Sequence, residues 1–254
     1  MRARPQLQRF FDDPASIVGN SVKFSEGISH QISQVLRLDV HNDEVIVLDG
    51  SGAAYLARLN GKSGRIATAE IFDALTDDLE LLSEITLCFS LTKREKVEWI
   101  LQKCTEIGVS CFQPFVSERS VSRTENMDEN RRTRWESIIR EAAEQSERSK
   151  LPTLMEVMSF DELLDKMIGD THKLIAYEGA DPARTFHQLT LKREPVILMI
   201  GPEGGFCDEE ATRAINAGFQ PFSLGKRILR METACMVASA LVVGRMESTA
   251  SSCD

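Results

Sequence analysis

No stretch of eighteen consecutive apolar residues occurs among the 254 residues of this chain, so the sequence offers no candidate for a membrane-spanning helix. The N-terminal segment, Met1 to Arg9, is basic but lacks the apolar core of a secretory signal peptide. We therefore expect a cytosolic protein with no membrane partner.

Cysteine is present but not in the spacing that a zinc site requires. The six cysteines form no CxxC pair, and most lie within apolar segments. We therefore expect no metal and no disulfide framework, and interpret these residues as small buried hydrophobic side chains. They are Cys88, Cys104, Cys111, Cys207, Cys235 and Cys253.

Positive charge is in deficit, because 30 Lys and Arg residues against 39 Asp and Glu residues give a formal net charge of -9. This balance excludes indiscriminate coating of nucleic acid, although a local basic groove is still compatible with it. Hydrophobic residues make up 42% of the chain, which is enough for a core and excludes a wholly disordered chain, collagen and a coiled coil.

The first part of the chain predicts a small β-barrel. Apolar runs at 44–49, 53–59 and 65–75 predict three strands, separated by glycine turns and by a loop at 60–64. A short helix is expected after His30, from the helical spacing of the apolar residues that follow it. The acidic stretch 73–84 is interpreted as a junction, which gives domains 1–78 and 79–254.

From residue 85 onward, strands and helices alternate, which predicts a parallel α/β sheet covered on both faces. Strands are expected at 85–91, 109–116, 173–178, 195–200 and 219–224. Helices are expected around 97–104 and at 131–149, 160–167, 208–217 and 232–246.

Two loops carry the candidate chemistry, because ligands of α/β sheets bind at the carboxyl ends of the strands. The first is GPEGGF, Gly201 to Phe206, whose glycines let a ligand approach the backbone, although a plain tight turn is the alternative. It is neither GxGxxG nor a Walker loop, which argues against an oxidoreductase or another nucleotide-linked enzyme.

The second loop, Leu224 to Ala234, carries three cations within five residues, at Lys226, Arg227 and Arg230. A solvated connector is the usual role of such a run. Against that role, the apolar pair Ile228 and Leu229 separates Arg227 from Arg230, and a solvated connector has little need for such a pair.

Together these loops resemble the RsmE family of small-subunit ribosomal RNA uridine N3-methyltransferases, which belongs to the SPOUT class. Further matches in chain order are RFF at 9–11, HQISQVLR at 30–37, LDG at 48–50, QKCTEIGV at 102–109, SERS at 117–120, RW at 134–135 and EAAEQS at 141–146. The chain departs from the family pattern at Asn42, Glu147, Cys207 and Met231. Cys207 predicts a poorer helix cap than Ser or Thr, and Glu147 would weaken an RNA contact if that helix end faces phosphate.

The resemblance implies an α/β fold in which a SPOUT-type parallel sheet with a C-terminal trefoil knot follows a PUA-like barrel that helps to hold RNA. It also implies a homodimer, S-adenosylmethionine as cofactor, and 16S ribosomal RNA or the small ribosomal subunit as partner. The residues expected to bind the cofactor are Glu178, Gly179, Gly201, Pro202, Glu203, Gly204, Gly205, Leu224, Gly225, Ile228 and Leu229. The residues expected to contact RNA are Arg9, Arg37, Lys93, Lys103, Arg119 and Arg123.

The implied chemistry needs a group that stabilises deprotonated uracil, because a neutral imide is a poor nucleophile. Arg230 is the predicted cation, with a salt bridge at the dimer contact as its alternative role. Glu232 and Glu178 are the candidate bases. Glu203 either contacts the ligand or bonds the amides of its own loop. The alternative function is an RNA-binding ribosome assembly factor with an inactive methyltransferase domain.

Overall fold

The computed structural model describes residues 7–75, 80–81, 83–122, 127–167, 171–179, 186, 189, 191 and 194–250. The chain divides into two compact units, the first made of residues 1–80 and 143–151, the second of residues 81–142 and 152–254. The sequence predicted a boundary at residue 78 but not the return of residues 143–151 to the first unit.

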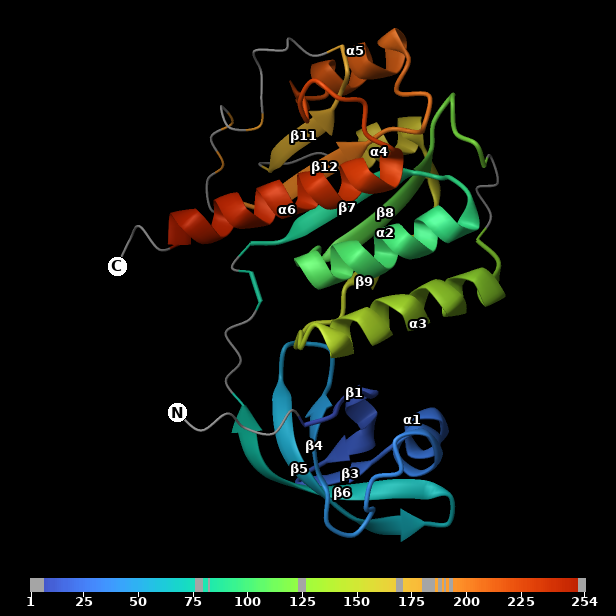
Figure 1. The fold of residues 1–254 in the computed structure, drawn as a ribbon, viewed down its shortest axis with the longest axis vertical. Coiled ribbons are helices and arrows are strands. Elements are labelled where there is room, and N and C mark those ends of the chain that lie inside the picture. Colours follow the sequence, from blue (N-terminus) through green and yellow to red (C-terminus); the bar gives the residue numbers. More distant parts are fainter. Residues whose placement is uncertain are drawn as a thin grey trace. The chain divides into compact units, whose positions relative to one another are not determined.

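The first unit holds a six-stranded mixed sheet that curls into a barrel-like shape (Figure 1). The sheet order is β1-β4-β5-β6-β3-β2, and only the pairing of β1 with β4 is parallel. The strands are β1 (Arg9–Phe11), β2 (Ile17–Val18), β3 (Ser21–Lys23), β4 (Glu44–Leu48), β5 (Ala54–Ser63) and β6 (Ile66–Leu75).

The three strands predicted for this unit are present as β4, β5 and β6. The prediction of a loop at 60–64 is largely wrong. Gly61 and Lys62 pair with Thr68 and Ala67, so β5 continues to Ser63 across a register shift. The helix predicted after His30 is present as a π-helical turn over Gln31–Val35, which directly continues α1 (Glu26–His30), a helix that the sequence did not predict. A short 3-10 turn lies earlier in the chain, at Pro14–Ser16.

Residues 143–151 complete the first unit through apolar and polar contacts. Ala143 packs in one core cluster with Phe11 and Leu48. The main-chain N–H of Phe11 donates to a carboxylate oxygen of Glu144 at 3.0 Å. Lys150 forms an antiparallel bridge with Ser51. A segment distant in sequence therefore closes one side of this core.

The second unit holds a wholly parallel sheet of order β10-β8-β7-β12-β11-β13, with β9 paired to β8. Its strands are β7 (Ile85–Ser90), β8 (Cys111–Val116), β9 (Thr153–Leu154), β10 (Met158–Ser159), β11 (His172–Ala176), β12 (Val196–Ile200) and β13 (Gln220–Phe222). Its helices are α2 (Arg94–Ile107), α3 (Glu129–Gln145), α4 (Phe160–Lys166), α5 (Asp208–Asn216) and α6 (Met231–Ala250), and the last turn of α3, from residue 143, belongs to the first unit.

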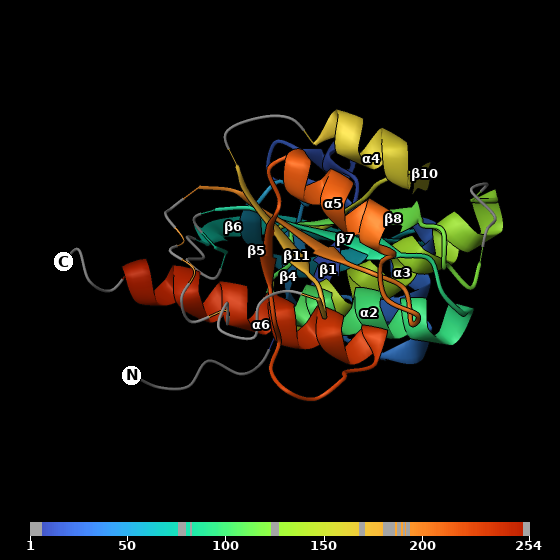
Figure 2. The ribbon, with the colours of Figure 1, turned by 90° about the horizontal axis from the view of Figure 1, so that it is seen from above.

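Helices cover both faces of this sheet, as the alternating pattern predicts (Figure 2). Seen from above, α2 and α6 lie on one side of the strands, and α4 and α5 lie on the other. Every residue of β12 is buried, as expected of a central strand covered on both faces. The predicted α/β class is confirmed, and the trefoil knot stays a prediction. None of the helices in the described part of the chain is long and apolar enough to cross a membrane.

Candidate functional site

A cavity of about 560 Å³ lies where β11, β12 and β13 end, which is the edge of a parallel sheet at which ligands bind. Its wall comes from the three loops that follow these strands and from the start of α6. A cavity of this size lies within the range of small-molecule sites. The second unit alone supplies it.

The cavity gathers every residue that the sequence predicted for cofactor binding. The lining includes Glu178, Gly179, Gly201, Pro202, Glu203, Gly204, Gly205, Leu224, Gly225, Ile228 and Leu229. Residues that sequence reasoning missed also line it, among them Tyr177, Phe206, Asp208, Phe222, Lys226 and Met231. These residues flank the predicted ones along the chain, so proximity to the motifs is the signal that could have found them.

Glycine is needed in the loop after β12 because the backbone approaches a buried ring. A β-carbon at Gly201 would lie 2.8 Å from Cε2 of Phe206. Gly205 has a φ of 68°, in the left-handed region that glycine adopts without strain. The loop therefore turns tightly and presents main-chain atoms to the cavity.

Glu203 projects to a contact that the sequence did not predict. Its Oε1 accepts hydrogen bonds from the hydroxyl of Thr92 and from Nζ of Lys96, the latter at 2.9 Å. Burial alone would raise the pKa of Glu203, but these bonds outweigh it and hold the pKa below its ordinary value. Both partners lie at the start of α2, so the carboxylate anchors the glycine loop to another element.

Arg119, predicted to contact RNA, lies in the cavity wall. Its Nη1 donates to the carbonyl oxygen of Gly204 at 3.0 Å. Across the cavity lining, the hydroxyl of Tyr177 donates to Oδ1 of Asp208 at 2.9 Å, and this bond raises the pKa of Tyr177. Polar side chains therefore stand beside the main-chain surface of the glycine loop.

The two predicted catalytic residues do not line the cavity. Arg230 is exposed, and its carbonyl oxygen accepts the N–H of Ala234 at 2.8 Å as α6 begins. Glu232 is only 9% exposed, with Oε2 at 3.5 Å from Nζ of Lys96. Met231 and Ala234 are the α6 residues of the wall. The catalytic roles of Arg230 and Glu232 stay predictions.

The remaining RNA candidates occupy different positions. The Arg9 side chain is 9% exposed, and Nη1 donates to the carbonyl oxygen of Glu147 at 3.0 Å, so Arg9 ties residues 143–151 to the first unit. Arg37 is exposed with a φ of 54°, and Lys93 is exposed before α2. Lys103 forms an ion pair with Glu106 at 2.8 Å. Arg123 lies outside the described residues. The geometry gives Arg9 a contact inside its own unit, and the predicted RNA roles all stay predictions.

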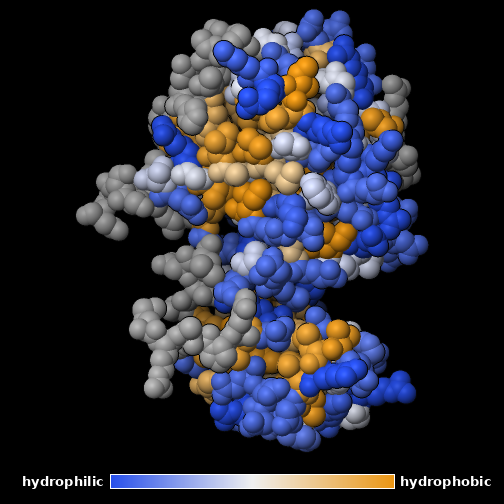
Figure 3. Space-filling view, in the orientation of Figure 1, coloured by the Kyte–Doolittle hydropathy of each residue, from blue (hydrophilic) through white to orange (hydrophobic). Residues whose placement is uncertain are grey.

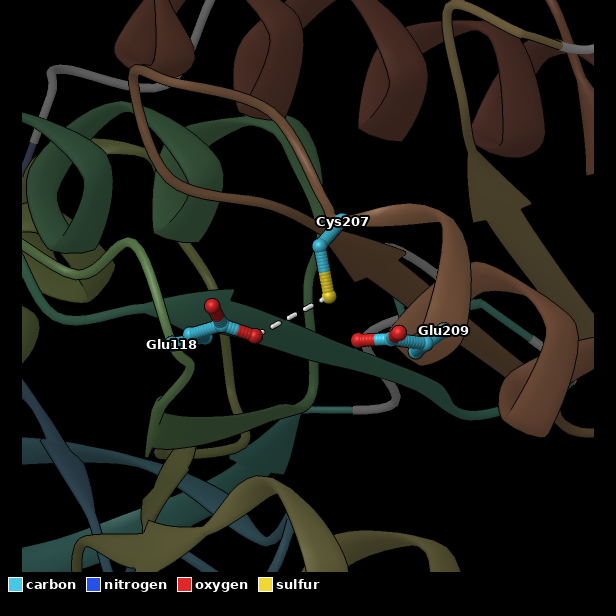
Figure 4. Close-up of side chains that lie close together, drawn as sticks. All are labelled: Glu118, Cys207 and Glu209. Atoms are coloured by element: carbon cyan, nitrogen blue, oxygen red, sulfur yellow. Dashed lines mark hydrogen bonds between the residues drawn. The ribbon is translucent and has the colours of Figure 1, made fainter.

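Cys207 is the N-cap residue of α5. Its Sγ accepts the N–H of Glu210 at 3.4 Å and donates to Glu118 at 3.2 Å (Figure 4). The Glu210 carboxylate in turn accepts the N–H of Cys207 at 3.1 Å. The reciprocal hydrogen-bond pattern of a capping box is therefore complete, and the prediction that sulfur makes a poorer cap than Ser or Thr stays a prediction.

The same close-up shows Glu209 beside this pair, so that ligand atoms of Glu118, Cys207 and Glu209 lie within 4.8 Å of one another. Burial, followed by neighbouring carboxylates, raises the pKa of the Cys207 thiol. The thiol therefore acts as a hydrogen-bonding group here. Cys88, Cys104 and Cys235 are buried, as predicted, whereas Cys253 lies outside the described residues.

The sequence is similar to those of known RNA methyltransferases. Residues 79–243 match a family model described as an RNA methyltransferase domain. The chain is 36% identical over 238 residues to a ribosomal RNA small subunit methyltransferase E from a Synechocystis species, covering 92% of this chain and 77% of the relative. The Bacillus subtilis protein of the same name is 31% identical, with 84% and 86% covered.

Solved structures agree over nearly the whole chain. A ribosomal RNA small subunit methyltransferase E from Neisseria gonorrhoeae bound to S-adenosyl methionine superposes with a TM-score of 0.84 at 34% identity, covering 96% of this chain and 98% of that one. A methyltransferase from Legionella pneumophila in complex with the same cofactor gives a TM-score of 0.83 at 26% identity, with 96% and 98% covered.

Proposed function

Because the chain belongs to the ribosomal RNA small subunit methyltransferase E family, we propose that it transfers a methyl group from S-adenosylmethionine to N3 of a uridine in 16S ribosomal RNA. The observation that carries the proposal is the cavity at the ends of β11, β12 and β13, which gathers all the predicted cofactor residues. Two structures of this fold bind the same cofactor.

The residues present fit this cofactor. The glycine loop lines the cavity, and a β-carbon at Gly205 would meet nothing within 4 Å, so main-chain atoms there can suit the hydrogen-bonding edge of adenine. Leu224, Ile228 and Leu229 supply apolar contacts. When bound, S-adenosylmethionine supplies an electrophilic methyl group on a sulfonium, and the protein's own groups must prepare the nucleophile.

Uracil N3 carries a proton that must leave for the nitrogen to attack. A guanidinium beside O2 or O4 would stabilise the negative charge that develops there. Arg230 takes this role in our proposal, since it follows the cavity loop directly and is exposed to a large substrate. Glu232 or Glu178 would accept the proton, directly or through water. Of these three residues, Glu178 lies in the cavity wall.

The proposed substrate, a uridine of 16S ribosomal RNA, follows from the family. We propose that this RNA is met in the cytoplasm, as part of the small ribosomal subunit. Arg37, Lys93, Lys103, Arg119 and Arg123 are the proposed RNA contacts. N3 lies on the base-pairing edge of uracil, so the target base must be unpaired when it reacts, and extrusion from a helix is the usual solution.

A homodimer built on α6 is also proposed. Met231, Cys235, Ala238 and Val242 of α6 are buried within the unit. A second, partly or fully exposed stripe of the helix is nevertheless apolar, and Figure 3 shows hydrophobic atoms gathered over α6. The stripe consists of Met236, Val237, Ala240, Leu241 and Gly244. A second copy of the chain would cover this α6 stripe.

The test is methyl transfer to small ribosomal subunits from a strain that lacks this protein. We expect mass spectrometry of the digested RNA to find N3-methyluridine only when the protein and S-adenosylmethionine are both added. Cofactor binding by calorimetry without methyl transfer would favour the assembly factor with an inactive domain. A protein that binds no S-adenosylmethionine would overturn the proposal.

A further inference from the structure

We propose that Lys96 is a positioning residue of the cofactor cavity, and that its ammonium group fixes the glycine loop and the start of α6 relative to each other. The inference rests on the proposed function, because it assigns the cavity to S-adenosylmethionine. Lys96 does not itself line the cavity, so it acts through two neighbours that border the wall.

The contacts of Lys96 reach both sides of the site. Nζ donates to Oε1 of Glu203 at 2.9 Å and lies 3.5 Å from Oε2 of Glu232. Glu203 is part of the glycine loop after β12, whereas Glu232 lies in the first turn of α6. The hydroxyl of Thr92, which is 4% exposed, adds a second donor to Glu203. One short segment at the start of α2 therefore holds two elements that are distant in sequence.

The electrostatics make this ammonium hard to replace. Glu203, through its hydrogen bond, is the first cause that raises the pKa of Lys96 above its ordinary value, and Glu232 adds to the effect. Oε2 of Glu232 is buried and accepts no hydrogen bond from the described residues, so the Lys96 ion pair is what balances its charge. Without Lys96, two nearby carboxylates would face each other with no cation between them, which is costly in a partly buried place.

The consequence for the cavity follows from chain connectivity. Pro202 and Gly204, on either side of Glu203, line the wall, and so does Met231, which precedes Glu232. If the carboxylates move apart, these main-chain segments move with them. Cofactor affinity should therefore depend on Lys96, although the side chain makes no cofactor contact.

The experiment measures S-adenosylmethionine affinity by calorimetry, the kcat and KM of methyl transfer to small ribosomal subunits, and thermal unfolding without cofactor. We expect Lys96→Met to weaken cofactor binding by about 10–100-fold, the equivalent of one lost charged hydrogen bond. The KM for the cofactor should rise in proportion. If Glu178 is the base, kcat at saturation should change by less than about threefold, whereas a Glu232 base would lose its paired cation and kcat would change as well. Lys96→Arg should restore most of the affinity, because it returns the positive charge.

Arg94→Met is the matched control, since Arg94 lies in the same turn of α2 and pairs with Glu98 at 2.7 Å, away from the cavity. It should leave affinity and kcat unchanged. Glu203→Gln should reproduce the loss of affinity, and the double variant with Lys96→Met should lose little more, because the pair acts as one unit. Glu203→Gln and Lys96→Arg keep the proposal testable if Lys96→Met folds poorly, because neither variant contains that substitution.

Three results would overturn the proposal. The first is a lower melting temperature with unchanged cofactor affinity, which would make Lys96 structural only. The second is a Lys96→Arg variant that binds S-adenosylmethionine as weakly as Lys96→Met does. The third is strict additivity of the losses in binding free energy caused by Lys96→Met and Glu203→Gln. A wild-type protein that binds no S-adenosylmethionine would instead overturn the proposed function, and the positioning role with it.

Discussion

Gly201 has no room for a β-carbon, because Phe206 packs against it in the core with Phe115 and Phe160. We expect Gly201→Ala to lower the free energy of unfolding by about 1–3 kcal/mol and to weaken S-adenosylmethionine binding, since the ring and the loop must shift. Chemical denaturation and calorimetry measure the two effects. Gly204→Ala is the control, because its nearest contact would be an ordinary 3.6 Å to Arg119. Equal losses in both variants would contradict the steric argument.

Arg230 carries the proposed charge stabilisation of the uracil imidate. Arg230→Ala should lower kcat by about 10²–10³ with little change in cofactor affinity, because the charge matters most in the transition state. Arg230→Lys should recover only part of the rate, since a point charge does not replace the guanidinium fork. Raising the pH should partly rescue Arg230→Ala by increasing the imidate fraction of the substrate.

The control for Arg230 is Arg213→Ala, which removes an exposed arginine of α5 that pairs with Asp161. Single-turnover kinetics measures the rate of methyl transfer and calorimetry measures cofactor affinity, and together they distinguish a catalytic role of Arg230 from a structural one. If Arg230→Ala instead produces monomers that no longer bind cofactor, the dimer salt bridge is its role and the catalytic assignment is wrong.

Residue-level prediction worked where a short motif carries its own geometry. The glycine loop and the Leu224 to Leu229 segment both reach the cavity as predicted, because each follows a strand of the parallel sheet. The Lys96 contact with Glu203 spans 107 positions in sequence, and no local pattern in the chain signals it. The hydrogen bond from Arg9 to the carbonyl oxygen of Glu147 inside its unit was likewise not predicted, and the RNA contact of Arg9 stays a prediction.

Elements with a clear hydrophobic period were predicted, and most strands of two or three residues were not, β13 being the exception. The helices α2, α3, α5 and α6 and the strands β7 and β12 lie within a few residues of their expected positions, because each repeats its apolar residues over several turns or forms a continuous run. The strands β1, β2, β3, β9 and β10 have only two or three residues each, too few to establish a period. The return of residues 143–151 to the first unit depends on tertiary contacts alone.

One such contact centres on Glu80, whose carboxylate accepts hydrogen bonds from Arg148 and from the N–H groups of Ser149 and Lys150. Although burial acts to raise the pKa of Glu80, these bonds lower it below its ordinary value. Because the folded pKa is depressed, this stability is present above the unfolded pKa and is lost as pH falls through the folded one. We expect Glu80→Gln to cost about 3 kcal/mol or more at pH 7.

Chemical denaturation across pH checks this expectation. The difference between wild type and Glu80→Gln should shrink as the pH falls below about 4, because the unfolded carboxyl takes up its proton there while the folded carboxyl takes up its proton only at a lower pH. Glu44→Gln is the control, because its pair with Arg58 is exposed on both sides and should contribute little. A difference that stays constant with pH would mean that packing, not charge, is lost in Glu80→Gln.

At the scale of the whole molecule, the α6 stripe predicts self-association. Val237, 37% exposed, lies within that stripe, so Val237→Glu should place a charge in the contact and yield monomers at micromolar concentration. Analytical ultracentrifugation measures the change. Ile215→Glu, which alters an exposed residue of α5, should leave the dimer intact. A wild-type protein that is active as a monomer would show that the α6 contact is not required.

The formal net charge of -9 confines RNA binding to local groups of cations, and salt should reveal how many take part. Phosphate contacts release counterions, whereas main-chain contacts to a cofactor do not, so raising the salt concentration should weaken binding to small ribosomal subunits and leave S-adenosylmethionine affinity nearly unchanged. Lys93→Ala and Arg37→Ala should each reduce the slope of log affinity against log salt by about one. Lys166→Ala, in the last turn of α4, is the control and should keep the wild-type slope. Filter binding over a salt series measures these slopes, and variants that all retain the wild-type value would remove Lys93 and Arg37 from the RNA contact.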